Sequence, residues 1–230
     1  MDLDLKEKNI KLIELIKNHQ LKEITPIIIE FDGTPNSGKT TIAEETFKVL
    51  KNLFKCSYIT ERAINCKISD KLSPRFNFVT GTQTIIKIIE EIESGSQIII
   101  CERGLLDAII WMDFHYANNK ISNNSNQLMA DFYLAKEFIN YKSFSIIMKC
   151  DSNTTIKREK ITNKYITDKR IVNKQIIDKY NISIEKCYDK YKHFLKSIKI
   201  DTSSLSIQNV FDRCLFYILK YINEELNNEV

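Results

Sequence analysis

Residues 26–41 read PIIIEFDGTPNSGKTT, in which a strand-sized apolar run is followed by a turn with a glycine at each end. The apolar run, residues 26–31, has the length and composition of a buried strand. Helix-forming residues follow the turn, and a helix is expected from residue 39 to about residue 54. The stretch therefore predicts a strand, a tight turn and a helix in direct succession.

The turn matches the pattern G-x-x-x-x-G-K-[ST] in the strand–turn–helix setting that its mechanism requires. Backbone N–H groups of such a turn converge on phosphate, and the positive end of the helix dipole favours the anion. The ammonium of Lys39 would bridge the β- and γ-phosphates, and the hydroxyl of Thr40 would coordinate Mg²⁺. For Thr41, contact with the α-phosphate and a capping role in the helix are both open. We expect ATP (or GTP) with Mg²⁺ to be held by Gly33, Asn36, Ser37, Gly38, Lys39, Thr40 and Thr41.

Further apolar and helical segments alternate along the rest of the chain. Strands are expected at 57–60, 97–101, 144–150 and 197–200, and helical periodicity is present at 5–19, 82–93 and 128–138. The segment 118–126 predicts a surface loop, 154–196 is charged and mainly helical, and Ser206 can cap a last amphipathic helix. Strands that alternate with helices predict an α/β fold with a parallel sheet.

Composition limits the classes of protein that this chain can be. Hydrophobic residues make up 43% and charged residues 28%, which is typical of one folded, water-soluble domain spanning residues 1–230. No apolar run is long enough to cross a membrane, and the charged N-terminus lacks a secretory pattern, so a cytoplasmic location is expected. The net charge of +4 does not favour a nucleic-acid partner, although a local basic cleft stays open. The six cysteines are expected to be reduced and mostly buried.

Charged residues follow two of the predicted strands, where ligands gather in parallel sheets. Glu102 and Arg103 come after the third strand: Glu102 can hold Mg²⁺ through water, and Arg103 can clamp phosphate or form a structural ion pair. Glu61 follows the second strand and would face the phosphate loop if that strand neighboured the first. It is the candidate general base, with a salt bridge to Arg62 or Lys67 as the alternative.

A basic segment that includes Arg158, Lys164 and Arg170 follows the fourth strand on predicted helix. A solvated helix face is the default interpretation. After a phosphate loop, however, such a segment also suits a mobile lid whose cations close over the transferring group. We expect Arg158 to act in this way.

With these residues in place, residues 26–222 resemble the P-loop nucleoside and nucleotide kinase superfamily, especially its thymidylate kinase and deoxynucleoside kinase branch. The sequences FDGTPNSGKTT (31–41) and CERG (101–104) carry the resemblance, although Gly104 replaces the usual small hydroxyl or aromatic residue. The resemblance implies a three-layer fold with five parallel strands in the order 2-3-1-4-5, flanked by helices and a helical lid at about 154–175. Residues 1–24 would form an N-terminal helical extension.

The same resemblance implies roles on the acceptor side. Glu61 would take the proton of a nucleoside 5′-hydroxyl, with Arg62 and Arg103 beside it. Phe78 and Gln83 are similar to an aromatic residue and a glutamine that hold the nucleobase in that branch, whereas Trp111 is expected in the core.

Three functions are compatible with these features. The first is ATP-dependent phosphoryl transfer to a nucleoside or nucleoside monophosphate, with Lys39, Arg103 and Arg158 neutralising the transferred charge. The second is a kinase of a polynucleotide 5′-end or another small hydroxyl substrate. The third is a regulatory NTPase switch that acts through the segments 62–75 and 118–126. The first and last helices could each also form a homodimer surface.

Overall fold

The computed structural model describes residues 2–19, 24–135, 142–162, 173–192 and 195–228. Its centre is a five-stranded, wholly parallel sheet in the order β2-β3-β1-β4-β5, as predicted. The strands are β1 (Ile27–Gly33), β2 (Cys56–Ile59), β3 (Ile98–Glu102), β4 (Lys142–Lys149) and β5 (Lys196–Asp201). Because all strands run the same way, their carboxyl ends meet at one edge.

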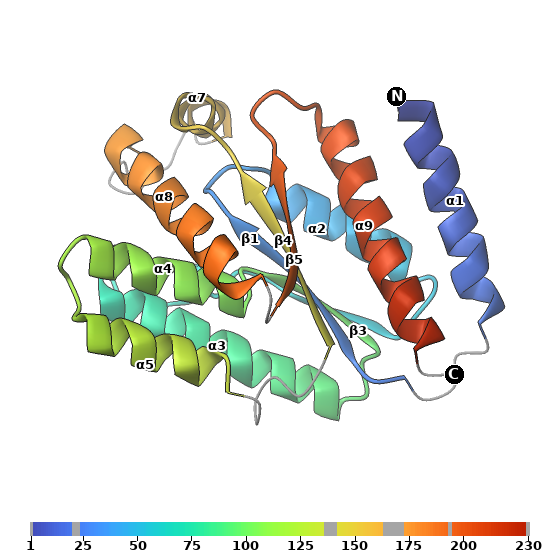
Figure 1. Cartoon of the computed structure of the whole chain (residues 1–230), viewed down its shortest axis with the longest axis horizontal. Coiled ribbons are helices and arrows are strands. Elements are labelled where there is room, and N and C mark those ends of the chain that lie inside the picture. The colour runs from blue at the N-terminus through green and yellow to red at the C-terminus, as the bar shows by residue number, and fades with distance from the viewer. Residues whose placement is uncertain (1, 20–23, 136–141, 163–172, 193–194, 229–230) are drawn as a thin grey trace.

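Helices cover both faces of the sheet and complete a three-layer α/β fold (Figure 1). One face carries α2 (Lys39–Leu50) and α9 (Ile207–Asn227), with α1 (Asp2–Asn18) packed on α9. The other carries α3 (Pro74–Glu93), α4 (Leu105–Ala117), α5 (Asn123–Tyr133) and α8 (Lys174–Tyr191). A short 3₁₀ turn, η1 (Arg62–Ile64), follows β2, and α7 (Ser152–Thr162) follows β4.

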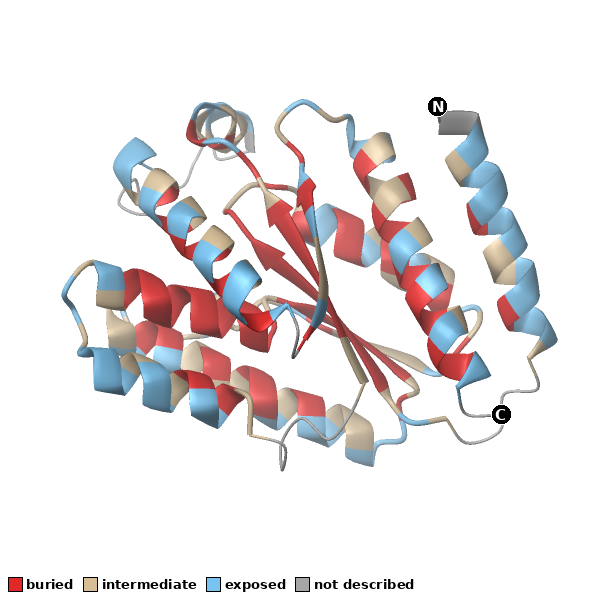
Figure 2. Ribbon diagram, viewed as in Figure 1, coloured by how far each residue is buried: buried red, intermediate tan, exposed pale blue. Residues whose placement is uncertain are grey.

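The alternation of side chains along β1 builds two separate cores. Ile27, Ile29 and Phe31 face α2 and α9, whereas Ile28 faces α3, α4 and α8. All seven residues of β1 are buried, because both neighbouring strands and both helical layers cover it (Figure 2). The strand that leads into the glycine turn is therefore the most enclosed part of the fold, which holds the turn rigidly.

Two local features differ from what the sequence predicted. The helix α4 was not predicted, because its residues from Leu105 to His115 are all buried and no polar face gives a helical period (Figure 2). Residues 123–126 of the predicted loop 118–126 belong to α5. Ser122 caps the N-terminus of this helix by accepting from Ser125 N. The second strand pairs with β3, as the predicted order requires, so the position of Glu61 depends on the loop that follows β2.

The ends of the chain follow their predictions more closely. Ser206 caps α9 by accepting from Asn209 N, as expected. The extension forms α1, and its Ile16 is fully buried against the α9 core. Of the predicted lid, residues 163–172 lie outside the described residues, Lys164 and Arg170 among them.

Four of the six cysteines are buried, in agreement with the expectation of mostly buried thiols. Within the described ranges, no helix combines the length and the apolar character needed to cross a bilayer.

Candidate active site

The turn between β1 and α2 is shaped by its two terminal glycines. Gly33 and Gly38 have φ values of 111° and 100°, in the left-handed region that glycine adopts without strain. A Cβ atom on Gly33 would lie 2.4 Å from the carbonyl oxygen of Met148, so no larger residue fits there. The turn is thereby held against β4, and α2 begins at Lys39 immediately after it.

Lys39 folds back over the turn. Its Nζ donates to the carbonyl oxygens of Gly33 at 3.0 Å and Thr34 at 2.6 Å, and the residue is 6% exposed. Burial, with the nearby charge of Arg103, lowers the pKa of Lys39 to about 7. A phosphate bound in the turn would supply the negative charge that this ammonium lacks.

A possible magnesium site lies beside Lys39. The Thr40 hydroxyl donates to Glu102 Oε2 at 2.6 Å, and the Tyr58 hydroxyl donates to the other oxygen of the same carboxylate. Hydroxyl and carboxylate oxygens are hard donors that suit Mg²⁺, which keeps several waters and uses few protein ligands. No group of three or more acidic, His or Cys side chains that could hold an ion occurs in the described part of the chain. The residues therefore fit an ion shared with water and phosphate, held by Thr40 and Glu102.

Arg103 forms the wall next to this turn. Its Nε lies 2.6 Å from Glu61 Oε1, and its NH1 donates to both carboxylate oxygens of Asp107 at 3.1 Å. Burial alone would lower the pKa of Arg103, but the Glu61 and Asp107 carboxylates raise it above its ordinary value, so the guanidinium stays charged. Asp107 also accepts from Gly33 N and from the Tyr180 hydroxyl, which ties the wall to the turn.

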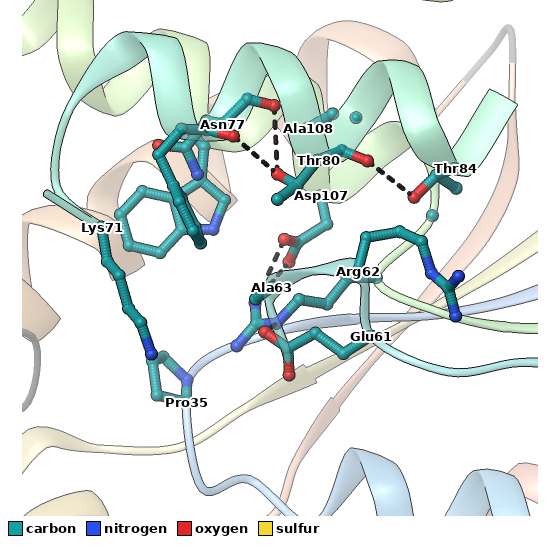
Figure 3. A pocket seen from close by; sticks show the side chains of 15 residues that line it. Pro35, Glu61, Arg62, Ala63, Lys71, Asn77, Thr80, Thr84, Asp107 and Ala108 are labelled. Carbon is teal, nitrogen blue, oxygen red and sulfur yellow. Dashed lines mark hydrogen bonds and ion pairs between the residues drawn. The ribbon is translucent and has the colours of Figure 1, made fainter. Parts of the chain in front are cut away.

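Two cavities meet at this wall. The first, here called the P-loop cavity, has a volume of about 500 Å³ and is lined by residues 35–42 together with Arg158, Thr202, Leu205, Ile207 and Val210. The second, the α3 cavity, has a volume of about 160 Å³ and lies between α3, α4 and the segment after β2 (Figure 3). Pro35, Glu61 and Arg103 line both cavities. A group bound in one cavity can therefore meet a group bound in the other at the ion pair between Glu61 and Arg103.

The structure brings most of the predicted site residues to these cavities. All of the expected phosphate-loop residues except Gly33 line the P-loop cavity, Thr41 included. Gly33 is the residue at which β1 ends and the turn begins. Arg158 lines the same cavity, and its guanidinium donates to the Asn36 and Thr202 carbonyl oxygens; its expected role as a lid cation stays a prediction. Arg62 lines the α3 cavity while its side chain donates to Thr60.

Two predicted substrate contacts lie elsewhere. Phe78 is 45% exposed, and neither Phe78 nor Gln83 is among the residues that line the α3 cavity. The face of α3 that does line it is formed by Phe76, Asn77, Thr80, Gly81 and Thr84. Phe78 and Gln83 lie on a neighbouring part of the helix surface, rotated by a fraction of a turn about the axis of α3. Their contact with a substrate stays a prediction.

Sequence reasoning missed Asp107 as a residue of the site, and it placed Trp111 correctly in the core without expecting it to line a cavity. Asp107 organises Arg103, and its position four residues after Arg103, in the first turn of the helix that follows, is the signal that could have found it. Trp111, expected in the core, is 7% exposed, packs on Tyr180 at 4.3 Å between ring centroids and also lines the α3 cavity.

Comparison with known proteins gives likeness at the level of structure alone. No protein-family model matches the chain, and no curated protein sequence matches it. Among solved structures, deoxyadenosine kinase from M. mycoides with the products dCMP and a flexible dCDP is similar, with a TM-score of 0.62 and 18% identity over 86% of this chain and 99% of that one. The dATP-bound form gives a TM-score of 0.62 and the dCTP-bound form 0.60, each at 18% identity, covering 85% and 86% of this chain and 99% of each neighbour. These likenesses show the P-loop kinase fold.

Proposed function

We propose that the protein is a Mg²⁺-dependent kinase that moves the γ-phosphoryl group of ATP (or GTP) to the 5′-hydroxyl of a nucleoside or to the phosphate of a nucleoside monophosphate. The observation that carries the proposal is the meeting of two cavities at Glu61 and Arg103, one lined by a phosphate-binding turn and the other closed by helices. Phosphoryl transfer between two bound molecules requires that their reacting atoms come close together, and two cavities that meet at shared residues allow this.

The P-loop cavity holds the donor. Backbone N–H groups of the turn and the N-terminus of α2 receive the phosphates, and Lys39 exchanges its carbonyl partners for phosphate oxygens. Thr40 and Glu102 would hold Mg²⁺, which neutralises charge on the β- and γ-phosphates. Thr202, Leu205, Ile207 and Val210 form the far end of the cavity, where the base of the donor would lie beside the Arg158 guanidinium.

The α3 cavity holds the acceptor. Glu61 accepts the proton of the 5′-hydroxyl as that oxygen forms its bond to the γ-phosphorus, while the bond from phosphorus to the β-phosphate oxygen breaks and the diphosphate leaves. Arg103 stays charged beside Glu61 and stabilises the transferred group. Asp107 and Tyr180 hold Arg103 in this position.

The structural neighbours support the choice of acceptor class. The deoxyadenosine kinase structures are described with dATP, dCTP, dCMP and dCDP, which are all deoxynucleotides. The positive charge of Arg103 is balanced by its ion pairs with Glu61 and Asp107. This balance favours a neutral nucleoside over an acceptor that already carries phosphate.

The test is the transfer of labelled γ-phosphate from ATP·Mg²⁺ to nucleosides, nucleoside monophosphates and 5′-hydroxyl oligonucleotides, with Lys39→Ala as the blank. We expect labelled nucleoside monophosphate, absent in the variant. Labelled oligonucleotide would instead indicate a polynucleotide kinase, and phosphate release without any labelled acceptor would indicate an NTPase.

The role of Glu61 has its own variant. Glu61→Gln keeps the size of the side chain but cannot accept the hydroxyl proton, so we expect kcat to fall by about 10²- to 10⁴-fold with little change in the KM for ATP. Glu45→Gln, an exposed carboxylate paired with Lys48 on α2, is the matched control and should leave kcat unchanged. Full activity of Glu61→Gln would refute the assignment of Glu61 as the base.

A further inference from the structure

One buried pair of polar side chains lies at the helical wall of the α3 cavity. Asn77 on α3 lines the cavity, and its Oδ1 lies 2.7 Å from Nε2 of His115 on α4. Asn77 is 5% exposed and His115 is fully buried. The pair joins α3 and α4, the two helices that enclose the cavity.

The protonation of His115 decides how this pair is arranged. Burial, with the nearby charge of Lys120, lowers the pKa of His115 to about 4, so the ring is neutral and carries one N–H group at physiological pH. His115 Nδ1 is buried and has no partner among the described residues. If the proton lay on Nδ1, a buried donor would be orphaned, which is rarer than an orphaned acceptor. The proton therefore lies on Nε2 and is donated to Asn77 Oδ1.

This donation fixes the amide of Asn77. With Oδ1 turned toward His115, the NH₂ group of Asn77 has no acceptor within the described part of the chain and is left to the cavity. The other polar side chains of this α3 face are committed, since the hydroxyls of Thr80 and Thr84 donate to carbonyl oxygens of α3 itself at 3.1 Å (Figure 3). On this face of α3, the NH₂ group of Asn77 is therefore the hydrogen-bond donor that is available to a bound molecule.

We propose that His115 is a positioning residue for base selection: it locks the Asn77 amide so that only N–H donors face the nucleobase in the α3 cavity. Bases whose edge carries a carbonyl oxygen or a bare ring nitrogen at that place are bound, and bases that present an amino or N–H group there are rejected. The inference rests on the proposed function and names the specificity of the same site. Phe76 and Trp111, which line the cavity with Asn77, supply the apolar surface for the rings.

The protein contains a built-in probe for this test. Trp111 is the single tryptophan of the chain, it lines the α3 cavity, and its ring centroid lies 6.2 Å from that of His115. Quenching of its fluorescence by the four natural 2′-deoxynucleosides gives a Kd for each base without ATP or turnover. The same four nucleosides are then compared in transfer assays at saturating ATP.

Two variants of His115 separate positioning from folding. His115→Phe keeps a buried ring but removes the donor, so the Asn77 amide can turn over, and we expect the ratio of best to worst nucleoside Kd to fall by about tenfold or more. His115→Gln returns an N–H group near the place of Nε2 and should restore most of the ratio. The KM for ATP should stay within about twofold in both variants, because the donor cavity is separate.

The effect must also depend on Asn77. In an Asn77→Ala background, where no amide remains to be turned, His115→Phe should change the ratio no further. An unchanged ratio in His115→Phe, in a protein that binds and phosphorylates nucleosides, would overturn the positioning role and leave the proposed function intact. If no nucleoside quenched Trp111 or accepted phosphate in the unmodified protein, the proposed function and this inference would both be overturned.

Discussion

The carboxylate of Glu30 caps the N-terminus of a helix to which it does not belong. The residue at the cap position of α4 is Gly104, which has no side chain, and Glu30 on β1 accepts from Leu105 N at 3.2 Å and Leu106 N at 3.4 Å instead. A Cβ atom on Gly104 would lie 2.2 Å from Cδ of Glu30. Gly104, the residue at which this chain differs from the pattern of the branch that it resembles, therefore leaves the space that the Glu30 side chain occupies.

This complementarity predicts a non-additive pair of substitutions. Gly104→Ala should lower the free energy of unfolding by about 1–3 kcal/mol, because the new methyl group overlaps Glu30. Glu30→Ala should also destabilise, since it leaves the α4 amides uncapped. In Glu30→Ala/Gly104→Ala the space is open and the new methyl group meets no carboxylate, so the double variant should be more stable than the sum of the two single effects. Urea unfolding measures this, and strict additivity would contradict it.

Lys39 predicts a pH dependence of nucleotide binding. Its pKa is about 7 in the free protein, and bound phosphate raises it, so binding takes up a proton above pH 7. The affinity for ATP should be highest below pH 7 and should weaken as the pH rises from 7 toward the pKa of the complex, by up to about tenfold per unit. Calorimetric titrations between pH 7 and 9, in buffers of different ionisation enthalpy, measure both effects.

Lys39→Arg is the control for this linkage, because a guanidinium stays protonated over the whole range. Its overall affinity can fall, but its pH slope should be flat. Equal slopes in the two proteins would assign the pH dependence to another group.

At the scale of the elements, the sequence predicted those helices, strands and turns whose own residues carry a recognisable spacing. The strand, turn and helix of residues 27–50 carry their own spacing, and Glu102 and Arg103 could be located because they follow an apolar strand. The helix α4 lacks such a signal, since it is enclosed on every side. Asn77 and His115 were missed because the rotation of α3 about its axis is set by packing against α4, which no local pattern reports.

The N-terminal helix α1 should stabilise the fold without entering the reaction. Ile16 is fully buried against α9, whereas its neighbour Leu15 is 52% exposed. We expect Ile16→Ala to cost about 2–5 kcal/mol and Leu15→Ala to change stability by less than about 0.5 kcal/mol. Thermal unfolding checks the difference, and kcat of the folded variants should be equal. Equal stabilities would mean that α1 does not pack on α9 in solution.

At the scale of the whole molecule, the site follows from the direction of the sheet. Three chain segments distant in sequence reach the same edge: Gly33 ends β1, Glu61 follows β2 and Arg103 follows β3. Helices of opposite faces then close the two cavities, α2 and α9 around one and α3 and α4 around the other. In the proposed reaction, donor and acceptor would thus occupy different halves of the molecule, and among the described residues Pro35, Glu61 and Arg103 line both cavities.

This arrangement predicts that one molecule can fill both halves. A nucleoside joined to adenosine through a chain of four or five phosphates should bind about 10²-fold or more tightly than ATP, because the second contact becomes intramolecular. It should also quench Trp111, which lies in the α3 cavity, whereas adenosine tetraphosphate without the second nucleoside should bind like ATP and leave Trp111 unquenched. Competition titrations with the best nucleoside of the transfer assay measure the gain. If the joined molecule bound no tighter than adenosine tetraphosphate, the two cavities could not be occupied together, and direct transfer across the wall of Glu61 and Arg103 would be excluded.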